Sequence, residues 1–163
     1  MEKKREEHIL SLVVSNKPDV LARVAGILGG RGYNIDTLCV DATLDPAISK
    51  IILSVVQDQM AMTKIEKQLI RLIDVHSVSD LSSDKAVMRE MMLVRMKLTD
   101  KNKADIALII DTFQGRVVTM DGENCVIEMT GTKENLDKAI KSLKPLGIDD
   151  LARTGIVALE RTK

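Results

Sequence analysis

The stretch from Asn16 to Asn34, with the sequence NKPDVLARVAGILGGRGYN, carries the clearest chemistry in the chain. It leaves an apolar strand, turns through Asn16 and Pro18 into a helix, and ends in a cluster of glycines. The first turn of a helix has unpaired backbone N–H groups and the positive end of the helix dipole, so it suits an anion such as an amino-acid carboxylate. A capped helix between two strands explains the same residues without a ligand, and the residues alone leave both interpretations open.

The other candidate residues lack the spacing of a catalytic or metal-binding set. His8 and His76 each sit in a strand-like run, and no triad spacing surrounds them. Cys39 and Cys125 lie in separate apolar runs, without the C-x-x-C or H-x-x-x-H spacing of a zinc site. The glycine cluster ends a helix instead of opening one, which argues against a phosphate-binding loop. We therefore expect no catalytic residue and no metal ligand in this chain.

Composition narrows the classes of protein further. The 163 residues are 45% hydrophobic and 29% charged, which is typical of a globular protein with one ordinary or two small domains. Lys plus Arg equals Asp plus Glu at 24 each, so no basic excess indicates binding to nucleic acid or to an anionic membrane. Because the chain has no long apolar run and begins with charged residues, we expect neither secretion nor a membrane span. Two distant cysteines predict buried, reduced thiols and a cytoplasmic protein.

The pattern of apolar residues predicts the elements that position the opening stretch. Strands are expected over 8–14, 33–43, 48–56 and 74–81. Pro18 fits the first position of one helix, and the capping-box spacing of Thr63 and Glu66 indicates the start of another. The apolar stripes of these two helices are Val20, Val24, Ile27 and Leu28, then Ile65, Leu69, Leu72 and Ile73.

The second half of the chain repeats this order. Strands are expected over 89–98, 116–120, 124–130 and 150–160, with a hairpin at Asp121 and Gly122. One helix ends at Gln114 and Gly115, and Thr132 caps the other. The sequence therefore predicts an α+β fold of two tandem ferredoxin-like βαββαβ domains. We assign a charged tail to 1–7, domains to 8–81 and 89–163, and a linker to 82–88. One face of each sheet should stay uncovered, which favours oligomerisation.

Five segments of the chain closely resemble the regulatory small subunit of acetolactate synthase, also called acetohydroxyacid synthase. They are NKPDVLARVAGIL (16–28), RGYNIDTL (31–38), TLDPAISK (43–50), IEKQLIRLIDV (65–75) and LARTGIVALER (151–161). The resemblance covers nearly the whole chain. It implies that 8–81 is an ACT domain, and that the chain is a non-catalytic subunit without a cofactor of its own.

The resemblance also implies partners and a binding site. It implies a homodimer formed through the ACT domains, with valine or a related branched-chain amino acid bound at that interface. It further implies a catalytic large subunit that carries thiamine diphosphate, Mg²⁺ and FAD. The segment expected to hold the carboxylate of the effector consists of Asn16, Lys17, Pro18, Asp19, Val20 and Leu21. Asn34 and Ile35 of the partner subunit would receive its amino group and side chain.

Asp19 departs from the pattern that the resemblance implies, N-x-x-G-x-L, because it occupies the position of the glycine. Two carboxylates about 4 Å apart repel by roughly 4 kcal/mol at an effective dielectric constant near 20, which corresponds to as much as a thousandfold loss of affinity. The Asp19 side chain can instead turn outward, pair with the ammonium group of the effector, or be compensated by Lys17. We expect weakened or absent valine feedback with activation retained. A smaller departure is Lys50, where the family usually has arginine.

Two other functions are weighed against the regulatory subunit. A free-standing ACT-type amino-acid sensor would bind its ligand without an enzyme partner. A small independent enzyme would require a catalytic constellation, which the sequence does not contain.

Overall fold

The computed structural model describes residues 5–82 and 86–161, and these form two compact units. The first unit contains the chain up to Met88 together with the residues from Ile156 onward, and the second is Arg89–Gly155. These bounds differ from the expected domains, because the C-terminal segment belongs to the first unit. Of the expected linker and tail, 83–85 and 1–4 lie outside the described residues. No helix in the described ranges is long and apolar enough to cross a membrane.

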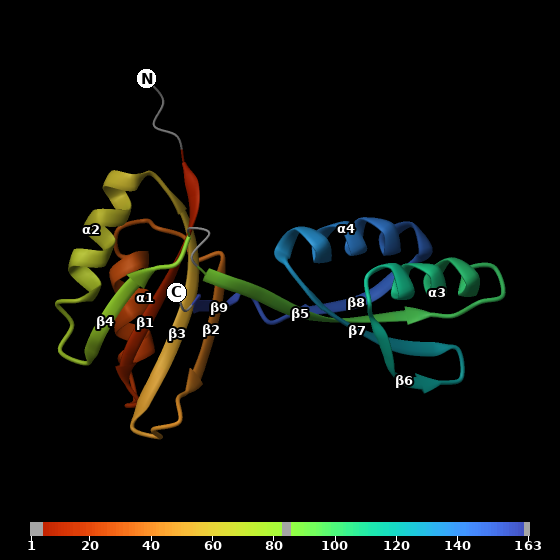
Figure 1. Cartoon of the computed structure of the whole chain (residues 1–163), viewed down its shortest axis with the longest axis horizontal. Coiled ribbons are helices and arrows are strands. Elements are labelled where there is room, and N and C mark those ends of the chain that lie inside the picture. Colours follow the sequence, from red (N-terminus) through yellow and green to blue (C-terminus); the bar gives the residue numbers. More distant parts are fainter. Residues whose placement is uncertain (1–4, 83–85, 162–163) are drawn as a thin grey trace. The chain divides into compact units, whose positions relative to one another are not determined.

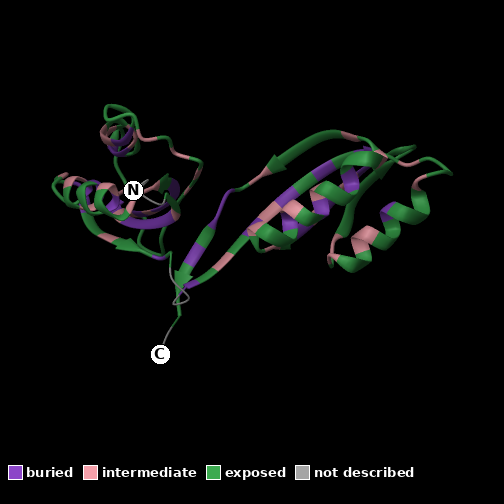
Figure 2. Ribbon diagram, turned by 90° about the horizontal axis from the view of Figure 1, so that it is seen from above, coloured by how far each residue is buried: buried purple, intermediate pink, exposed green. Residues whose placement is uncertain are grey.

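The first unit is a four-stranded antiparallel sheet with two helices (Figure 1). Its elements are β1 (Glu6–Ser15), α1 (Val20–Gly29), β2 (Thr37–Ala42), β3 (Ile48–Gln57), α2 (Gln59–Leu69) and β4 (Val75–Asp80). The strands lie in the order β2-β3-β1-β4. Alternate residues of β1 and β3, such as Leu10, Leu12 and Leu53, are fully buried against Val24 and Ile65 of the helices. Figure 2 shows this concentration of buried residues on the facing sides of strands and helices.

The second unit repeats the ferredoxin-like order. Its elements are β5 (Ala86–Lys97), α3 (Lys103–Thr112), β6 (Arg116–Asp121), β7 (Asn124–Gly131), α4 (Lys133–Leu143), a 3₁₀ turn (Lys144–Leu146) and β8 (Ile148–Arg153). The strands lie in the antiparallel order β6-β7-β5-β8, and β9 (Val157–Glu160) pairs with β5. Met92, Val94 and Ile127 are fully buried in its core. The α+β class and the tandem ferredoxin-like arrangement are therefore confirmed.

Both helices of the first unit begin elsewhere than expected. α1 starts at Val20, and Pro18 lies in the turn before it. α2 starts at Gln59, because the Asp58 side chain accepts hydrogen bonds from the backbone N–H groups of Met60 and Ala61. The predicted cap at Thr63 is wrong, since its hydroxyl lies inside the helix and donates to the carbonyl of Gln59. The helix also ends earlier than expected, at Leu69, and Ile73 of the expected stripe is 89% exposed.

The predicted end of α1 is confirmed in atomic detail. The N–H groups of Gly32 and Tyr33 donate to the carbonyls of Gly29 and Leu28, which is the Schellman arrangement. Gly32 holds the left-handed position of this motif with φ 73°. At the end of α3 the same position is held by Gln114, with φ 53°. The glycine cluster therefore terminates the helix, as its position predicted.

Two further expectations change at the C-terminal end and at the sheet faces. The single strand expected over 150–160 is two strands, β8 and β9, separated at Gly155, which has φ 78°. The face of the first sheet that we expected to be uncovered is partly covered by the chain itself. Ile9 and Ile52 on that face pack in one cluster with Leu81, Ala86, Ile156 and Ala158. This cluster explains why the last strand belongs to the first unit.

The start of α2 gives a direct test of these helix bounds. Asp58→Ala should lower the free energy of unfolding by about 1 kcal/mol, because it removes the acceptor for two N–H groups of the first turn. Thr63→Ala is the matched control and should change it by less than about 0.5 kcal/mol. Urea denaturation followed by circular dichroism measures both. If Thr63→Ala lowered the free energy of unfolding more than Asp58→Ala does, the result would support a helix start at Thr63 instead.

Candidate effector site at the start of α1

The turn between β1 and α1 is anchored to the turn between β2 and β3. The backbone N–H of Asn16 donates to the carbonyl of Ala47 over 2.7 Å, and its side-chain Nδ2 donates to the carbonyl of Pro46 over 2.9 Å. Because the amide nitrogen is engaged, the Oδ1 of Asn16 is left as the acceptor end of this side chain. An exposed acceptor beside a helix start is suited to the ammonium group of an amino acid.

Asp19 occupies the N-cap position of α1 in the left-handed conformation, with φ 64°. Its side chain makes no capping hydrogen bond, so it does not cover the N–H groups of the first helical turn. The carboxylate is 72% exposed and leans along the helix toward Arg23, with 3.8 Å between Asp19 Oδ2 and Arg23 Nε. Of the orientations considered for Asp19, the structure shows the outward one. The left-handed backbone also explains why glycine suits this position.

Asp74, which directly precedes β4, joins the charged residues of this site into one network. Lys17 Nζ donates to Asp74 Oδ1 over 3.0 Å, and Arg23 Nη2 donates to Asp74 Oδ2 over 2.5 Å. The backbone carbonyl of Asp74 also accepts from the N–H of Ser15 over 2.8 Å. Hydrogen bonds from Lys17 and then Arg23 lower the pKa of the Asp74 carboxyl. The two cations and the carboxylates of Asp19 and Asp74 cancel in charge.

Arg23 contributes one further feature. Its Nε is buried and makes no hydrogen bond within the part of the chain that the structure describes. The nearest carboxylate oxygen of Asp19, at 3.8 Å, is too distant for a hydrogen bond. The guanidinium is therefore held by Asp74 through Nη2, and its Nε keeps an N–H donor that no described residue accepts from.

The two halves of the predicted site lie at opposite ends of the first sheet. Asn34 and Ile35 precede Thr37, the first residue of β2, and Thr37 is level with Ile9 because both pair with the same residue of β3. Asn16 follows the far end of β1. At about 3.3 Å per strand residue, this places the two halves roughly 20 Å apart along the sheet. One chain therefore does not bring all the predicted site residues together around a single small ligand.

The two histidines and Arg153, which lie outside this site, have side-chain partners, whereas the two cysteines are unpaired thiols. His8 is buried, with 3.1 Å between its Nδ1 and Asp80 Oδ2, and the exposed His76 lies 3.0 Å from the hydroxyl of Ser15. Cys125 is buried as expected, whereas Cys39 is half-buried, and both are free thiols.

In the second unit, Arg153 of the outer strand β8 forms ion pairs with Glu90 and Asp137.

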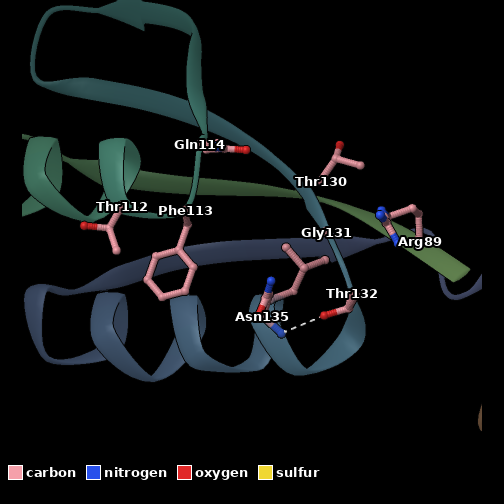
Figure 3. A pocket seen from close by; sticks show the side chains of 9 residues that line it. Arg89, Thr112, Phe113, Gln114, Thr130, Gly131, Thr132 and Asn135 are labelled. Carbon is pink, nitrogen blue, oxygen red and sulfur yellow. Dashed lines mark hydrogen bonds between the residues drawn. The ribbon is translucent and has the colours of Figure 1, made fainter.

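The second unit also has a pocket that the sequence did not indicate. It has a volume of about 430 Å³ and lies between the end of α3, the start of β5 and the first turn of α4 (Figure 3). Thr132, the predicted cap of α4, accepts a hydrogen bond there from the backbone N–H of Asn135. The other labelled side chains in the view are Arg89, Thr112, Phe113, Gln114 and Thr130. None of the predicted effector residues lines this pocket, because they all belong to the first unit.

Sheet order, helix placement and the turn at the start of α1 define the first unit as an ACT domain, a class of regulatory ligand-binding domains. Residues 10–77 match the family model for the ACT domain of the acetohydroxyacid synthase small subunit. Residues 89–162 match the family model for the small subunit of acetolactate synthase. The chain belongs to the family of acetolactate synthase small subunits.

Individual relatives agree over almost the whole length. The acetolactate synthase small subunit of Aquifex aeolicus is 38% identical over 156 residues, which cover 95% of this chain and 81% of the relative. The isozyme 3 small subunit of Salmonella typhimurium is 34% identical, and the match covers 94% of each chain. The crystal structure of the small subunit from Thermotoga maritima matches with a TM-score of 0.89 and 32% identity, covering 97% of this chain and 99% of that one.

The network around Asp74 predicts a pH-dependent contribution to stability. Asp74→Asn should lower the free energy of unfolding near pH 7, because Lys17 and Arg23 lose their shared carboxylate. The stabilisation by a carboxyl group with a lowered pKa is present above its ordinary value, here 3.8, and is lost as the pH falls through the lower pKa of the folded state. The difference between wild type and variant should therefore shrink below that value.

Urea denaturation at a series of pH values measures this difference. Asp149→Asn, at an exposed residue of β8, is the control and should give a small difference at every pH. A difference for Asp74→Asn that stays constant from neutral to strongly acidic pH would contradict the proposed charge network.

Proposed function

We propose that the first unit binds a branched-chain amino acid, valine or a close relative, at the start of α1. As a family member, the chain is a regulatory subunit without catalytic activity of its own. The observation that carries the proposal is the helix start itself: its N–H groups are not capped by Asp19, and Asn16 and Asp74 hold the adjoining turn in place. The N–H groups would receive the carboxylate. The Oδ1 of Asn16 cannot donate to a carboxylate, so Asn16 would instead share the ammonium group with the Asn34 segment of a second copy, a change from the role that the resemblance implied for Asn16.

The proposed site is completed by a second copy of the chain. The roughly 20 Å that separates Asn16 from Asn34 and Ile35 along the sheet prevents one chain from supplying both halves. A homodimer in which the ACT domains meet would place the Asn34 segment of one copy at the α1 start of the other. β2 and β4 are the outer strands of the first sheet and offer backbone groups for such pairing.

The regulated partner in this proposal is the catalytic large subunit of acetolactate synthase. Thiamine diphosphate, Mg²⁺ and FAD belong to that subunit, and this chain would raise its activity and transmit inhibition by the end product. Effector binding and contact with the catalytic subunit would be coupled by about 1–3 kcal/mol, the usual range for linked sites. A cytoplasmic location forms part of the proposal, and the two free thiols agree with it.

Asp19 sets the strength of the feedback in this proposal. Its outward orientation and its position beside Arg23 reduce the repulsion of a bound carboxylate below the value for two carboxylates in contact. It still adds negative charge at the mouth of the site, because the side chain is exposed and the pair with Arg23 is long. Weakened valine binding with retained activation therefore remains the expected behaviour.

Two substitutions at Asp19 separate the effect of charge from that of backbone conformation. Asp19→Asn removes the charge and keeps a residue that tolerates the left-handed conformation, whereas Asp19→Gly also removes the strain. Both should lower the dissociation constant of valine by about tenfold, because both remove the repulsion. Isothermal titration calorimetry with the full chain measures this constant. Tight binding to the wild type, with no improvement in either variant, would refute the role of Asp19.

Reconstitution with the catalytic subunit tests the regulatory function. The wild-type chain should raise the rate of acetolactate formation, and valine should inhibit the complex containing Asp19→Gly at a lower concentration than the wild-type complex. Asp149→Asn is the matched control and should behave as the wild type does. A free-standing sensor would bind valine in calorimetry, yet neither co-migrate with the catalytic subunit in gel filtration nor change its rate.

A further inference from the structure

β6 is an exposed outer strand of the second sheet (Figure 1). All six of its residues are exposed, and no other strand in the described ranges pairs with its outer side. Three of them are apolar: Val117 is 41% exposed, Val118 49% and Met120 60%. An outer strand presents a row of backbone N–H and C=O groups to any strand that can pair with it. Charged side chains on an outer strand usually discourage pairing with another chain. Three exposed apolar side chains on β6 therefore indicate that this edge contacts a partner.

The sequence of β6, RVVTMD, is complementary to itself when two copies run antiparallel. If a twofold axis passes between Val118 and Thr119, Arg116 of each copy lies opposite Asp121 of the other. Val117 then lies opposite Met120, and Val118 lies opposite Thr119. Each end of the pair carries one opposite-charge contact, and the apolar residues meet between them.

A bulge in β6 makes this pairing sterically consistent. Residues that face each other across two strands must point to the same side of the sheet, and in a regular strand residues five apart point to opposite sides. The register of β6 against β7 shifts between Val117 and Thr119. Consequently Val117 and Met120 both lie opposite core residues of β7, Ile127 and Cys125. By the same shift, Arg116 and Asp121 both lie on the other side of the sheet.

We infer that β6 is a self-association surface, through which the second units of two chains join their sheets into one continuous sheet. The Arg116 side chain is 74% exposed and contacts Glu128 of its own chain through Nε at 2.8 Å and Nη2 at 3.2 Å. A guanidinium has five N–H donors, so contact with Glu128 leaves donors for Asp121 of the second copy. This surface is separate from the effector site, because β6 belongs wholly to the second unit.

Charge reversal in trans tests this surface with the full-length chain. Arg116→Asp and Asp121→Arg each place like charges at both ends of the symmetric pair and should raise the dissociation constant of this step by about tenfold or more. An equimolar mixture of the two variants restores an opposite-charge contact at both ends. Sedimentation equilibrium should therefore show each variant alone associating no further than the dimer proposed for the ACT domains, and the mixture associating beyond it nearly as the wild type does. Asp149→Asn is the control and should behave as the wild type does.

Hydrogen–deuterium exchange locates the contact. In the wild type, the amides of 116–121 should become more protected as protein concentration rises over about a hundredfold range, and in Asp121→Arg they should not. Protection at 116–121 that is independent of concentration, or a mixture that associates no better than its components, would overturn the inference. It would equally be overturned if only the catalytic subunit protected these amides, since that would make β6 a surface for the enzyme. Dimerisation through the ACT domains is distinguished by where the protection occurs, because it should protect amides of the first unit instead of 116–121.

Discussion

The carboxylate of Asp74, which Lys17 and Arg23 share, is the interaction on which the proposed effector site depends. It lies at the junction of α2 and β4, yet its side chain holds Lys17 and Arg23 and its backbone holds the end of β1. A carboxylate with this little exposure needs cations beside it, and the cations in turn fix the turn that connects β1 to α1. The helix start is therefore positioned by a residue more than fifty positions away in sequence.

Parts of this architecture could be predicted because their signals are local. The Schellman end of α1 follows from the glycine at position 32, and the cap of α4 follows from Thr132. The start of α2 was misplaced because Asp58 and Thr63 both offer a capping oxygen, and only the backbone conformation decides between them. Local spacing favoured the later residue, whereas the extended backbone at Asp58 selects the earlier one.

The remaining differences come from contacts that no local pattern encodes. The last strand packs against Ile9 and Ile52, and this long-range cluster places it in the first unit instead of the second. The Asp74 network likewise joins segments that lie far apart in sequence. The proposed effector residues come from the resemblance, and the structure supplies the distance that supports a site shared by two chains. Asn16 and Asn34 lie at opposite ends of one sheet, so in the proposed site a second copy supplies the Asn34 segment.

The bulge in β6 also determines which register two copies can adopt. In the register centred between Val118 and Thr119, Val117 faces Met120 and Arg116 faces Asp121, and the two residues of each pair lie on the same side of the sheet. Sliding one copy by a single residue places Arg116 opposite Met120, which points to the other side of the sheet. Sliding it by two residues so that Thr119 faces Met120 again brings residues on opposite sides together. A bulge usually discourages edge pairing because a regular partner strand cannot follow it. A second copy of β6 carries the same bulge, so its backbone can match that of the first copy. The bulge therefore disfavours pairing with a regular strand and permits pairing with a second β6.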